Sequence, residues 1–451
     1  MNINSSKFNI DKLRVGLLVA ILVFLPFEMF PKFSVYGINI RISQLLGLIL
    51  IISCYPLLIR KVADIKKQPW LWLAGFVLVS AISSVFALSQ QKAISTTLFY
   101  AFDILLAYCV YLVFSTQKSD LYKKIIFAVS VFVAVFCMYQ FVGDTLGLNS
   151  GLLLLETRYT KLIFGFPRIQ GFSIEPLYLA NYLLIPIGLS LGALIVKPQR
   201  YLYGLLTLFT YLVWLTVARG AYFAVLSMLI LSLVIIVYKK QYRLAVNIVL
   251  LISFSAFLAF ASIWASGKFA TQLPESTKSQ TQYQTSIPQE GISSEGNTER
   301  LVEHTVDFTD ETSFTDRIKT SKTAGQLFVQ NPLTGVGPGN FGRYVVQKYP
   351  GTYTDVDQIV NNEPLEILAE VGLLGFLMLV GFAVWCIGRI ANYSVSRNNA
   401  NSNIWYYSTM FMMLGFLVQW QTFSTLYVTH IWVMIGIMLS ILLNSRLRKS
   451  N

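Results

Sequence analysis

The chain has 451 residues, of which 55% are hydrophobic and only 13% are charged, and its mean hydropathy is +0.59. Soluble globular proteins carry roughly 25% charged residues, so this composition excludes an ordinary soluble domain and favours a membrane protein. The formal net charge of +13 comes largely from Lys and Arg beside apolar segments, so it gives little support to nucleic-acid binding.

Runs of 16 to 22 mostly apolar residues recur along the chain, each about long enough to cross roughly 30 Å of hydrocarbon as a helix. Helices are the natural spanning form because a bilayer offers no water to backbone groups. We therefore predict an all-α polytopic membrane protein with about twelve spans, at 15–30, 42–59, 70–88, 93–114, 125–142, 176–196, 201–217, 220–238, 244–265, 371–391, 404–423 and 426–443. The first span follows basic residues and lacks a small-residue cleavage site, so we expect a retained anchor.

Basic residues are unevenly divided between the two ends of these predicted helices. Twenty Lys and Arg fall in short segments on the same side as the N-terminus, and seven fall in short segments on the other side. Because cytoplasmic loops are enriched in Lys and Arg, we predict that both termini are cytoplasmic. The long polar loop 266–363 then lies outside. It separates spans one to nine (1–265) from spans ten to twelve and a cytoplasmic tail (364–451).

The outside loop divides into two halves by composition. Residues 266–313 are rich in Ser, Thr, Gln, Glu and Pro, with few apolar anchors, so we expect them to be mobile. Residues 314–363 carry more apolar side chains, and we expect them to be ordered. Asp316 is a candidate cap for a helix there, which Asn331-Pro332 would end.

Two motifs in the ordered half resemble binding sites but have simpler interpretations. The run from Gly337 to Gly342 has the spacing G-x-G-x-x-G, yet it contains a proline and lies in an external loop of a membrane protein. A dinucleotide site needs a strand before this run and a helix after it. We interpret the glycine run, which begins at Gly335, as a tight bend that packs against the membrane helices. Asp355 and Asp357 form a D-x-D that we interpret as part of a solvated loop.

Cysteine and histidine give no sign of a metal centre or of a disulfide framework. All four cysteines fall inside predicted spans, and we interpret them as small apolar residues. The two histidines, His304 and His430, lack the spacing of metal ligands. We therefore expect neither a metal nor a cofactor.

Three arginines outside the cytoplasmic segments are candidate ligands for an anion. Arg219 lies between two apolar runs with almost no loop, a costly position unless the side chain is paired or faces water. The alternative is that it reaches the lipid headgroups. Arg168 belongs to the same outer rim. Arg317 lies near the start of the loop helix, where the helix dipole does not stabilise a cation. Two interpretations of Arg317 therefore remain: it binds a specific anion, or its side chain is solvated. Glu175 precedes Pro176, and we interpret it as a helix cap.

The helix predicted to begin near Pro364 carries three acidic residues on one face. Glu363, Glu366 and Glu370 are spaced three and four apart, which places them together, and Asn362 or Glu363 is the expected cap. Acidic residues stabilise a helix N-terminus, and that alone explains Glu363 and Glu366. Glu370 lies a turn deeper and is less easily explained in this way.

Taken together, these residues resemble the O-antigen ligase/polymerase family of bacterial envelope glycosyltransferases. The resemblance covers roughly residues 160–440 and rests on the order and placement of four motifs. They comprise Arg168, Gly171, Glu175, Pro176 and Ala180; Arg219 and Gly220; Arg317 with Asn331, Pro332, Leu333, Gly335, Gly337 and Gly339; and Asn361, Asn362, Leu365, Glu370, Gly372, Leu373, Leu374 and Gly375. The resemblance implies GT-C-like membrane helices with one large, late extracytoplasmic loop.

The resemblance also implies a reaction and a cellular location. Members of the family transfer a glycan from undecaprenyl diphosphate to an acceptor sugar on the outer side of the bacterial inner (cytoplasmic) membrane. Two arginines hold the diphosphate, and they correspond to Arg219 and Arg317, with Arg168 as a third candidate. Guanidinium groups suit this role because their geometry matches phosphate oxygens.

The position of the expected base differs from the ligase pattern. In ligases a histidine that begins the last motif is proposed to activate the acceptor hydroxyl, and this chain has Asn361 there. Asparagine cannot act as a general base. The resemblance therefore leaves two possibilities: Glu363, Glu366 or Glu370 takes the role, or base catalysis is minor.

The asparagine argues against a lipid A–core ligase and favours a polysaccharide polymerase of O-antigen or exopolysaccharide assembly. A ligase that attaches glycan to lipid A–core or to protein is the alternative. A transporter or flippase of lipid-linked glycan is the rival from another class, but no internal repeat is evident, and Asp103 is the clearest ionisable residue within a span. The expected partners are the lipid-linked oligosaccharide donor, a glycan acceptor, the bilayer and other polysaccharide-assembly proteins, and not nucleic acid.

Overall fold

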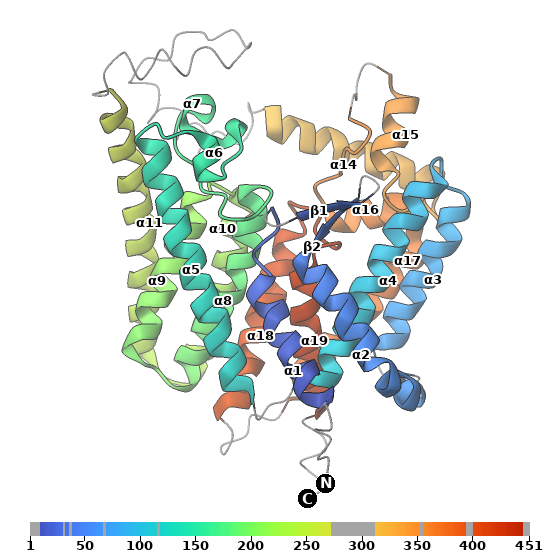
Figure 1. Cartoon of the computed structure of the whole chain (residues 1–451), viewed down its shortest axis with the longest axis horizontal. Helices are drawn as coiled ribbons and strands as arrows, with labels where there is room; N and C mark the ends of the chain where they lie inside the picture. Colours follow the sequence, from blue (N-terminus) through green and yellow to red (C-terminus); the bar gives the residue numbers. More distant parts are fainter. Residues whose placement is uncertain are drawn as a thin grey trace, which may run out of the picture.

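The computed structural model describes residues 10–29, 32–35, 38–65, 69–114, 118–271, 312–350, 353, 355–393 and 400–444. Within these ranges the chain is nearly all helical. Long helices run side by side as a bundle, and shorter helices gather at one end of it (Figure 1). A two-stranded antiparallel hairpin, β1 (Lys32–Val35) with β2 (Ile38–Arg41), lies at the same end.

Each of the twelve apolar runs coincides with a helix. These helices are α1 (Ile10–Phe24), α2 (Ile42–Ile65), α3 (Trp70–Val85), α4 (Gln90–Val113), α5 (Ser119–Thr145), α8 (Pro176–Val196), α9 (Arg200–Leu215), α10 (Arg219–Tyr238), α11 (Tyr242–Thr271), α17 (Gly372–Ala391), α18 (Ala400–Gln419) and α19 (Thr429–Asn444). Among the described helices, seven (in α2, α4, α5, α8, α10, α11 and α17) are long and apolar enough to cross a membrane, while α3 and α19 are shorter apolar helices. The chain is a multi-pass membrane protein, and the count of about twelve spans stays a prediction.

The remaining helices are short or polar. They are α6 (Ser150–Leu153), η2 (Thr157–Tyr159), α7 (Lys161–Phe164), α14 (Thr312–Gln330), α15 (Phe341–Lys348) and α16 (Glu363–Glu370). They lie at the end of the bundle opposite to the one where α1 begins and α19 ends (Figure 1). Most of the half-loop predicted to be mobile falls in 272–311, which lies outside the described residues, as does His304.

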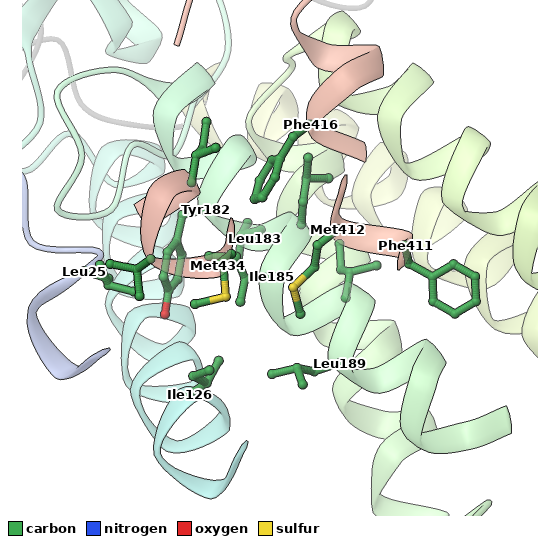
Figure 2. Close-up of a cluster of buried hydrophobic side chains, with 14 of the residues drawn as sticks. Leu25, Ile126, Tyr182, Leu183, Ile185, Leu189, Phe411, Met412, Phe416 and Met434 are labelled. Carbon is green, nitrogen blue, oxygen red and sulfur yellow. The ribbon is translucent and has the colours of Figure 1, made fainter. Parts of the chain in front are cut away.

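Helix α8 is the buried centre of one side of the bundle, and nearly all of its residues are buried. It packs against α5, α9, α10 and α18. Figure 2 shows side chains of this core, including Leu183, Ile185 and Leu189 of α8, Met412 and Phe416 of α18, and Met434 of α19.

Close approach of α8 and α18 depends on Gly192. A Cβ atom at Gly192 would lie 2.3 Å from Ser408 Oγ and 2.7 Å from Ser408 N. Gly192 is the second glycine of a G-x-x-x-G pair with Gly188, an arrangement of small residues that lets membrane helices approach closely. The position of α8 matters because its first residues reach the candidate site.

The glycine run of the ordered loop half forms the predicted tight bend. It packs against the end of α16, and Ser83 Oγ of α3 donates to Thr334 O just before the run. Gly335, Gly337 and Gly339 all have positive φ. The backbone N–H of Gly337 donates to Glu370 O at 2.8 Å, and Val336 N donates to Ala369 O at 2.9 Å. At Gly335 a Cβ atom would lie 2.3 Å from the carbonyl carbon of Glu370, so no larger residue fits there without backbone movement.

Two helix boundaries differ from the sequence prediction. The loop helix α14 begins at Thr312, so the proposed cap at Asp316 was wrong, and Asp316 lies inside the helix. The segment expected to be one helix is divided into α16, which ends at Glu370, and α17, which begins at Gly372. The loop between α14 and α15, residues 331–340, contains the glycine run, and we call it the glycine loop. The break occurs because Leu373 N donates to Pro332 O of this loop at 2.8 Å and not to a carbonyl of α16.

Two other boundary predictions are confirmed. Helix α14 ends at Gln330, immediately before Asn331-Pro332. Asn362 is the N-cap of α16, and its Oδ1 accepts a hydrogen bond from Leu365 N at 3.0 Å. Both signals act over three or four neighbouring residues, so they can be interpreted without knowledge of the tertiary structure.

Candidate functional site

A cavity of about 220 Å³ lies at the end of the bundle that carries the short helices. Its lining comes from well-separated parts of the chain: Tyr159, Phe164, Arg168, Glu175, Pro176, Leu177, Val217, Arg219, Gly220, Arg317, Asn361 and Phe423. We call this cavity the arginine pocket. It brings together the three candidate arginines and Asn361, but not the three glutamates of α16.

The first turns of two membrane helices open onto the arginine pocket. Helix α8 contributes Pro176 and Leu177, and helix α10 contributes Arg219 and Gly220. The N-terminus of a helix carries a partial positive charge and backbone N–H groups that favour anions. Both helix termini therefore add to the positive character that the arginines give the pocket.

Arg219 is the first residue of α10 and follows a very short turn. Residues 216–218 connect α9 to α10, and Val217 in this turn has φ +50°. The turn places Arg219 beside the pocket, where its side chain is half-buried. An arginine at this depth faces a polar cavity, as the cost of burying its charge requires.

Arg168 is fixed to the same turn. Its Nε donates to Thr216 O at 2.9 Å, and its Nη2 lies 3.4 Å from Val217 O. The guanidinium also lies over the rings of Phe164 and Tyr159, 4.4 Å and 5.4 Å from their centroids. Burial lowers the pKa of Arg168 to about 10, so the side chain stays charged at neutral pH.

Arg317 reaches the pocket from α14. Burial and, secondarily, the charge of Arg219 lower the pKa of Arg317 below its ordinary value. In the part of the chain that the structure describes, no carboxylate forms a salt bridge with Arg317. Cations that share a partly buried site repel each other unless an anion lies between them, so the pocket is suited to an anion.

Asn361 lines the pocket from the short turn before α16. Its backbone has φ +60°, the left-handed region that asparagine tolerates better than most residues. The residue before it, Val360, is held by a hydrogen bond from its N–H to Glu366 Oε2 at 2.8 Å. The position of Asn361 therefore depends on α16.

Glu363 and Glu366 are buried and accept hydrogen bonds from the turn between α18 and α19. Glu363 Oε2 accepts from Thr425 N at 2.5 Å and Leu426 N at 2.8 Å. Glu366 Oε2 also accepts from Ser424 Oγ at 2.7 Å. The residue before this anchored stretch is Phe423, which lines the arginine pocket. These carboxylates thus hold parts of the chain that reach the pocket without lining it themselves.

Glu370 is buried on the same helix and holds the glycine loop. Its Oε2 accepts from Gly339 N at 2.6 Å, and its Oε1 accepts from Phe341 N at 3.0 Å. Burial, with a smaller contribution from the charge of Glu366, raises the pKa of Glu370 to about 8. Burial likewise raises the pKa values of Glu363 and Glu366 above the ordinary range.

Glu175 is the carboxylate that lines the arginine pocket, and sequence reasoning did not give it a chemical role. It occupies the N-cap position of α8 as expected, but its side chain makes no capping hydrogen bond. Arg158 Nη2 lies 3.5 Å from Glu175 Oε1. The sequence signal around Pro176 indicates a helix start and nothing more. Tyr159, Phe164 and Phe423 were missed as well, because they lie in two short helices and a turn whose paths the sequence does not indicate.

The described residues contain no group of three or more His, Cys, Asp and Glu side chains that could hold a metal ion. Nε2 of His430 lies 2.6 Å from Asn181 Oδ1, and both residues are buried. The four cysteines are buried and free. The arginine pocket can bind an anion, and Glu175 gives it one group able to accept a proton.

A family model described as O-antigen ligase matches residues 204–380. The match supports assignment to the O-antigen ligase/polymerase family. The matched range runs from α9 into α17 and includes Arg219, Arg317 and Asn361, whereas Arg168 and Glu175 precede it. No curated protein matches the chain.

Proposed function

We propose that the protein transfers a glycan from undecaprenyl diphosphate to a hydroxyl group of an acceptor sugar. The observation that carries this proposal is the convergence of Arg168, Arg219 and Arg317 on one pocket at the N-termini of two membrane helices. The O-antigen ligase family match supports activity of the ligase/polymerase type. A lipid-linked diphosphate is the anion that this combination favours.

The proposed chemistry is displacement of the diphosphate from the sugar. Guanidinium groups form two parallel hydrogen bonds to phosphate oxygens. As the bond between the sugar and the diphosphate breaks, negative charge grows on the leaving group, and fixed cations stabilise that charge. Arg219 and Arg317 take this role, while Arg168, held by Thr216 and Val217, adds charge from a fixed position.

We favour a polymerase over a ligase. The position where ligases are proposed to carry a histidine is Asn361 here, and an asparagine cannot accept a proton. A ligase for lipid A–core or for protein would use the same arginine pocket and differ in its acceptor. The uneven distribution of basic residues supports an orientation with both termini cytoplasmic and the pocket facing outward. The bacterial inner membrane is the location that the family resemblance implies.

Glycan transfer by purified protein in lipid nanodiscs tests the proposal. The donor is a synthetic undecaprenyl-diphosphate oligosaccharide, and the acceptors are the same lipid-linked oligosaccharide, lipid A–core and a peptide in separate reactions. A polymerase elongates the first acceptor, whereas a ligase modifies only one of the other two. A protein that binds the donor and transfers nothing to any acceptor contradicts the proposal, and movement of the donor between leaflets would then indicate a transporter.

Conservative arginine variants sharpen this experiment. Arg219→Lys and Arg317→Lys keep the charge but lose the paired hydrogen bonds, so turnover should fall roughly 10²-fold or more, as it does when an oxyanion donor is removed. Arg343→Lys is the matched control, because Arg343 lies in α15 and does not line the pocket. Equal turnover in all three variants would exclude the proposed binding of the diphosphate by Arg219 and Arg317.

A further inference from the structure

Five of the side chains that line the arginine pocket carry an ionisable group: Tyr159, Arg168, Glu175, Arg219 and Arg317. Arginine does not deprotonate in proteins. Burial raises the pKa of Tyr159 above its ordinary value, so its phenol keeps its proton at neutral pH. Only the carboxylate of Glu175 is left to accept a proton from a bound molecule.

We propose that Glu175 is the general base that takes the proton from the acceptor hydroxyl, an inference that rests on the proposed glycan transfer. The proposal replaces the idea that an α16 glutamate is the base. Glu363, Glu366 and Glu370 are buried, do not line the pocket, and each accepts hydrogen bonds that hold a loop. Glu175 instead reaches the cavity that holds the arginines.

The surroundings of Glu175 suit a base. Its side chain is 34% exposed, so the hydroxyl group of an acceptor sugar can approach it from the aqueous side. Within the described ranges its carboxylate pairs only with Arg158, whose Nη2 lies 3.5 Å from Oε1, and no donor is hydrogen-bonded to Oε2. The backbone of the residue is also well fixed, because Glu175 O accepts from Tyr178 N and Leu179 N in the first turn of α8. A base on a rigid helix start keeps its geometry from one turnover to the next.

The proposed step balances. The acceptor hydroxyl gives its proton to the Glu175 carboxylate, and its oxygen forms the new bond to the anomeric carbon. The bond between that carbon and the diphosphate oxygen breaks, and its electron pair leaves with the diphosphate. The arginines hold the departing anion, so the base and the cations act on opposite partners in the displacement. The proton later leaves Glu175 to water.

The test uses Glu175→Gln, with Glu156→Gln as the matched control. Glu156 pairs with the same Arg158, at 2.7 Å, but does not line the pocket. Single-turnover glycan transfer and binding of a fluorescent undecaprenyl-diphosphate oligosaccharide are measured in nanodiscs. Loss of a general base costs typically 10²–10⁴-fold in rate, so Glu175→Gln should lose at least 10²-fold in transfer with donor affinity unchanged within threefold. Glu156→Gln should transfer at the wild-type rate.

The pH profile separates proton transfer from a structural role. Wild-type transfer should fall tenfold per pH unit on the acid side as the base becomes protonated, and the residual rate of Glu175→Gln should lack this dependence. Glu175→Asp should recover part of the rate. Transfer by the Glu175→Gln variant at the wild-type rate overturns the proposal. A fall in transfer rate that only parallels a fall in donor affinity overturns it as well. Neither result contradicts the proposed function, because that function is tested by the transfer rates of the wild-type protein and of the arginine variants.

Discussion

At the scale of single residues, the arginine pocket holds charges that are unfavourable together when the pocket contains no anion. Arg317 is influenced by the charge of Arg219 and by burial, as the direction of its pKa shift indicates. An anion that binds between them relieves the repulsion, and binding to the folded state alone raises stability by linkage. The arginines were recognisable in the sequence because a cation at a membrane boundary requires a partner or water.

Inorganic pyrophosphate should therefore stabilise the folded protein. At ten times its Kd the linkage relation gives about 1.4 kcal/mol, which a thermal melt in detergent can detect. Arg317→Gln should lose most of this shift, and Lys322→Gln should keep it because Lys322 lies on the same helix but not in the pocket. Sodium chloride at equal ionic strength is the control for screening. A shift of equal size in Arg317→Gln would show that the anion binds elsewhere.

Asn361 combines a backbone requirement with a side chain in the pocket. Because its φ is +60°, Asn361→Ala should destabilise the fold by about 1 kcal/mol, whereas Asn361→Gly should not. Both variants lack the side-chain amide of asparagine, so both should lose a similar, modest part of the transfer rate. Melting temperatures and transfer rates of the two variants test this. An Asn361→Gly variant that has wild-type stability but no transfer activity would contradict this prediction and would show that the side-chain amide is a central catalytic group.

At the scale of elements, α16 connects three separate loops through its three glutamates. Glu363 and Glu366 hold the α18–α19 turn, Glu366 holds Val360, and Glu370 holds the glycine loop. The sequence indicated that these acids share a helix face and that Asn362 or Glu363 is the cap. It could not show what the acids contact, because their partners are backbone N–H groups up to 63 residues away.

Folded-state stability should fall as pH rises through the range where these acids ionise. The pKa of Glu370 is raised to about 8, so its contribution is fully present below its unfolded-state pKa, near 4.5, and is lost as pH rises toward about 8. Thermal melts at pH 5.5 and 8.5 measure the slope. Glu370→Gln should flatten the slope without abolishing it, because Glu363 and Glu366 contribute in the same direction. An unchanged slope in Glu370→Gln would contradict the assignment.

The bend at Gly335 should tolerate no Cβ atom. Gly335→Ala combines φ +65° with backbone atoms of Glu370 within 2.4 Å of the new carbon, so the loss should exceed the roughly 1–2 kcal/mol of a left-handed alanine. Gly325→Ala is the control, because this glycine lies inside α14 with no atom within 4 Å, and alanine should stabilise a helix there by roughly 0.5–1 kcal/mol. Chemical or thermal unfolding of the two variants should give opposite signs. Equal effects would mean that the glycine loop does not pack as described.

The helices themselves were largely predictable, and their boundaries depended on how far each signal reaches. Apolar runs gave the membrane helices because hydropathy is a property of each segment alone. The division between α16 and α17 was not predictable, because Leu373 N bonds to Pro332 O across the fold. The proposed role of Glu175 was not predictable for the same reason, since the pocket around it is built from distant segments.

At the scale of the whole molecule, the short helices lie at the end of the bundle opposite to the one where α1 begins and α19 ends (Figure 1). Lys197 follows α8 at one end, and Val356 lies in the loop between α15 and α16 at the other. The positive-inside tendency predicts that the first lies in the cytoplasm and the second outside.

Cysteines at Val356 and Lys197 should react with a membrane-impermeant reagent from opposite sides. The four native cysteines are buried, so they give little background, and both target residues are exposed. In intact cells only Val356→Cys should label, and after permeabilisation both should. Labelling of Lys197→Cys in intact cells would reverse the proposed orientation.

The arginine pocket also sets an order of events during synthesis. Its lining runs from Tyr159 to Phe423, and Phe423 lies in the turn between the last two helices. A nascent chain that has inserted α10 already carries Arg168 and Arg219, yet Arg317 and Phe423 have still to be translated. The complete lining can form only after Phe423 has been translated, so a chain that stops before residue 423 should be inactive however well its earlier helices insert.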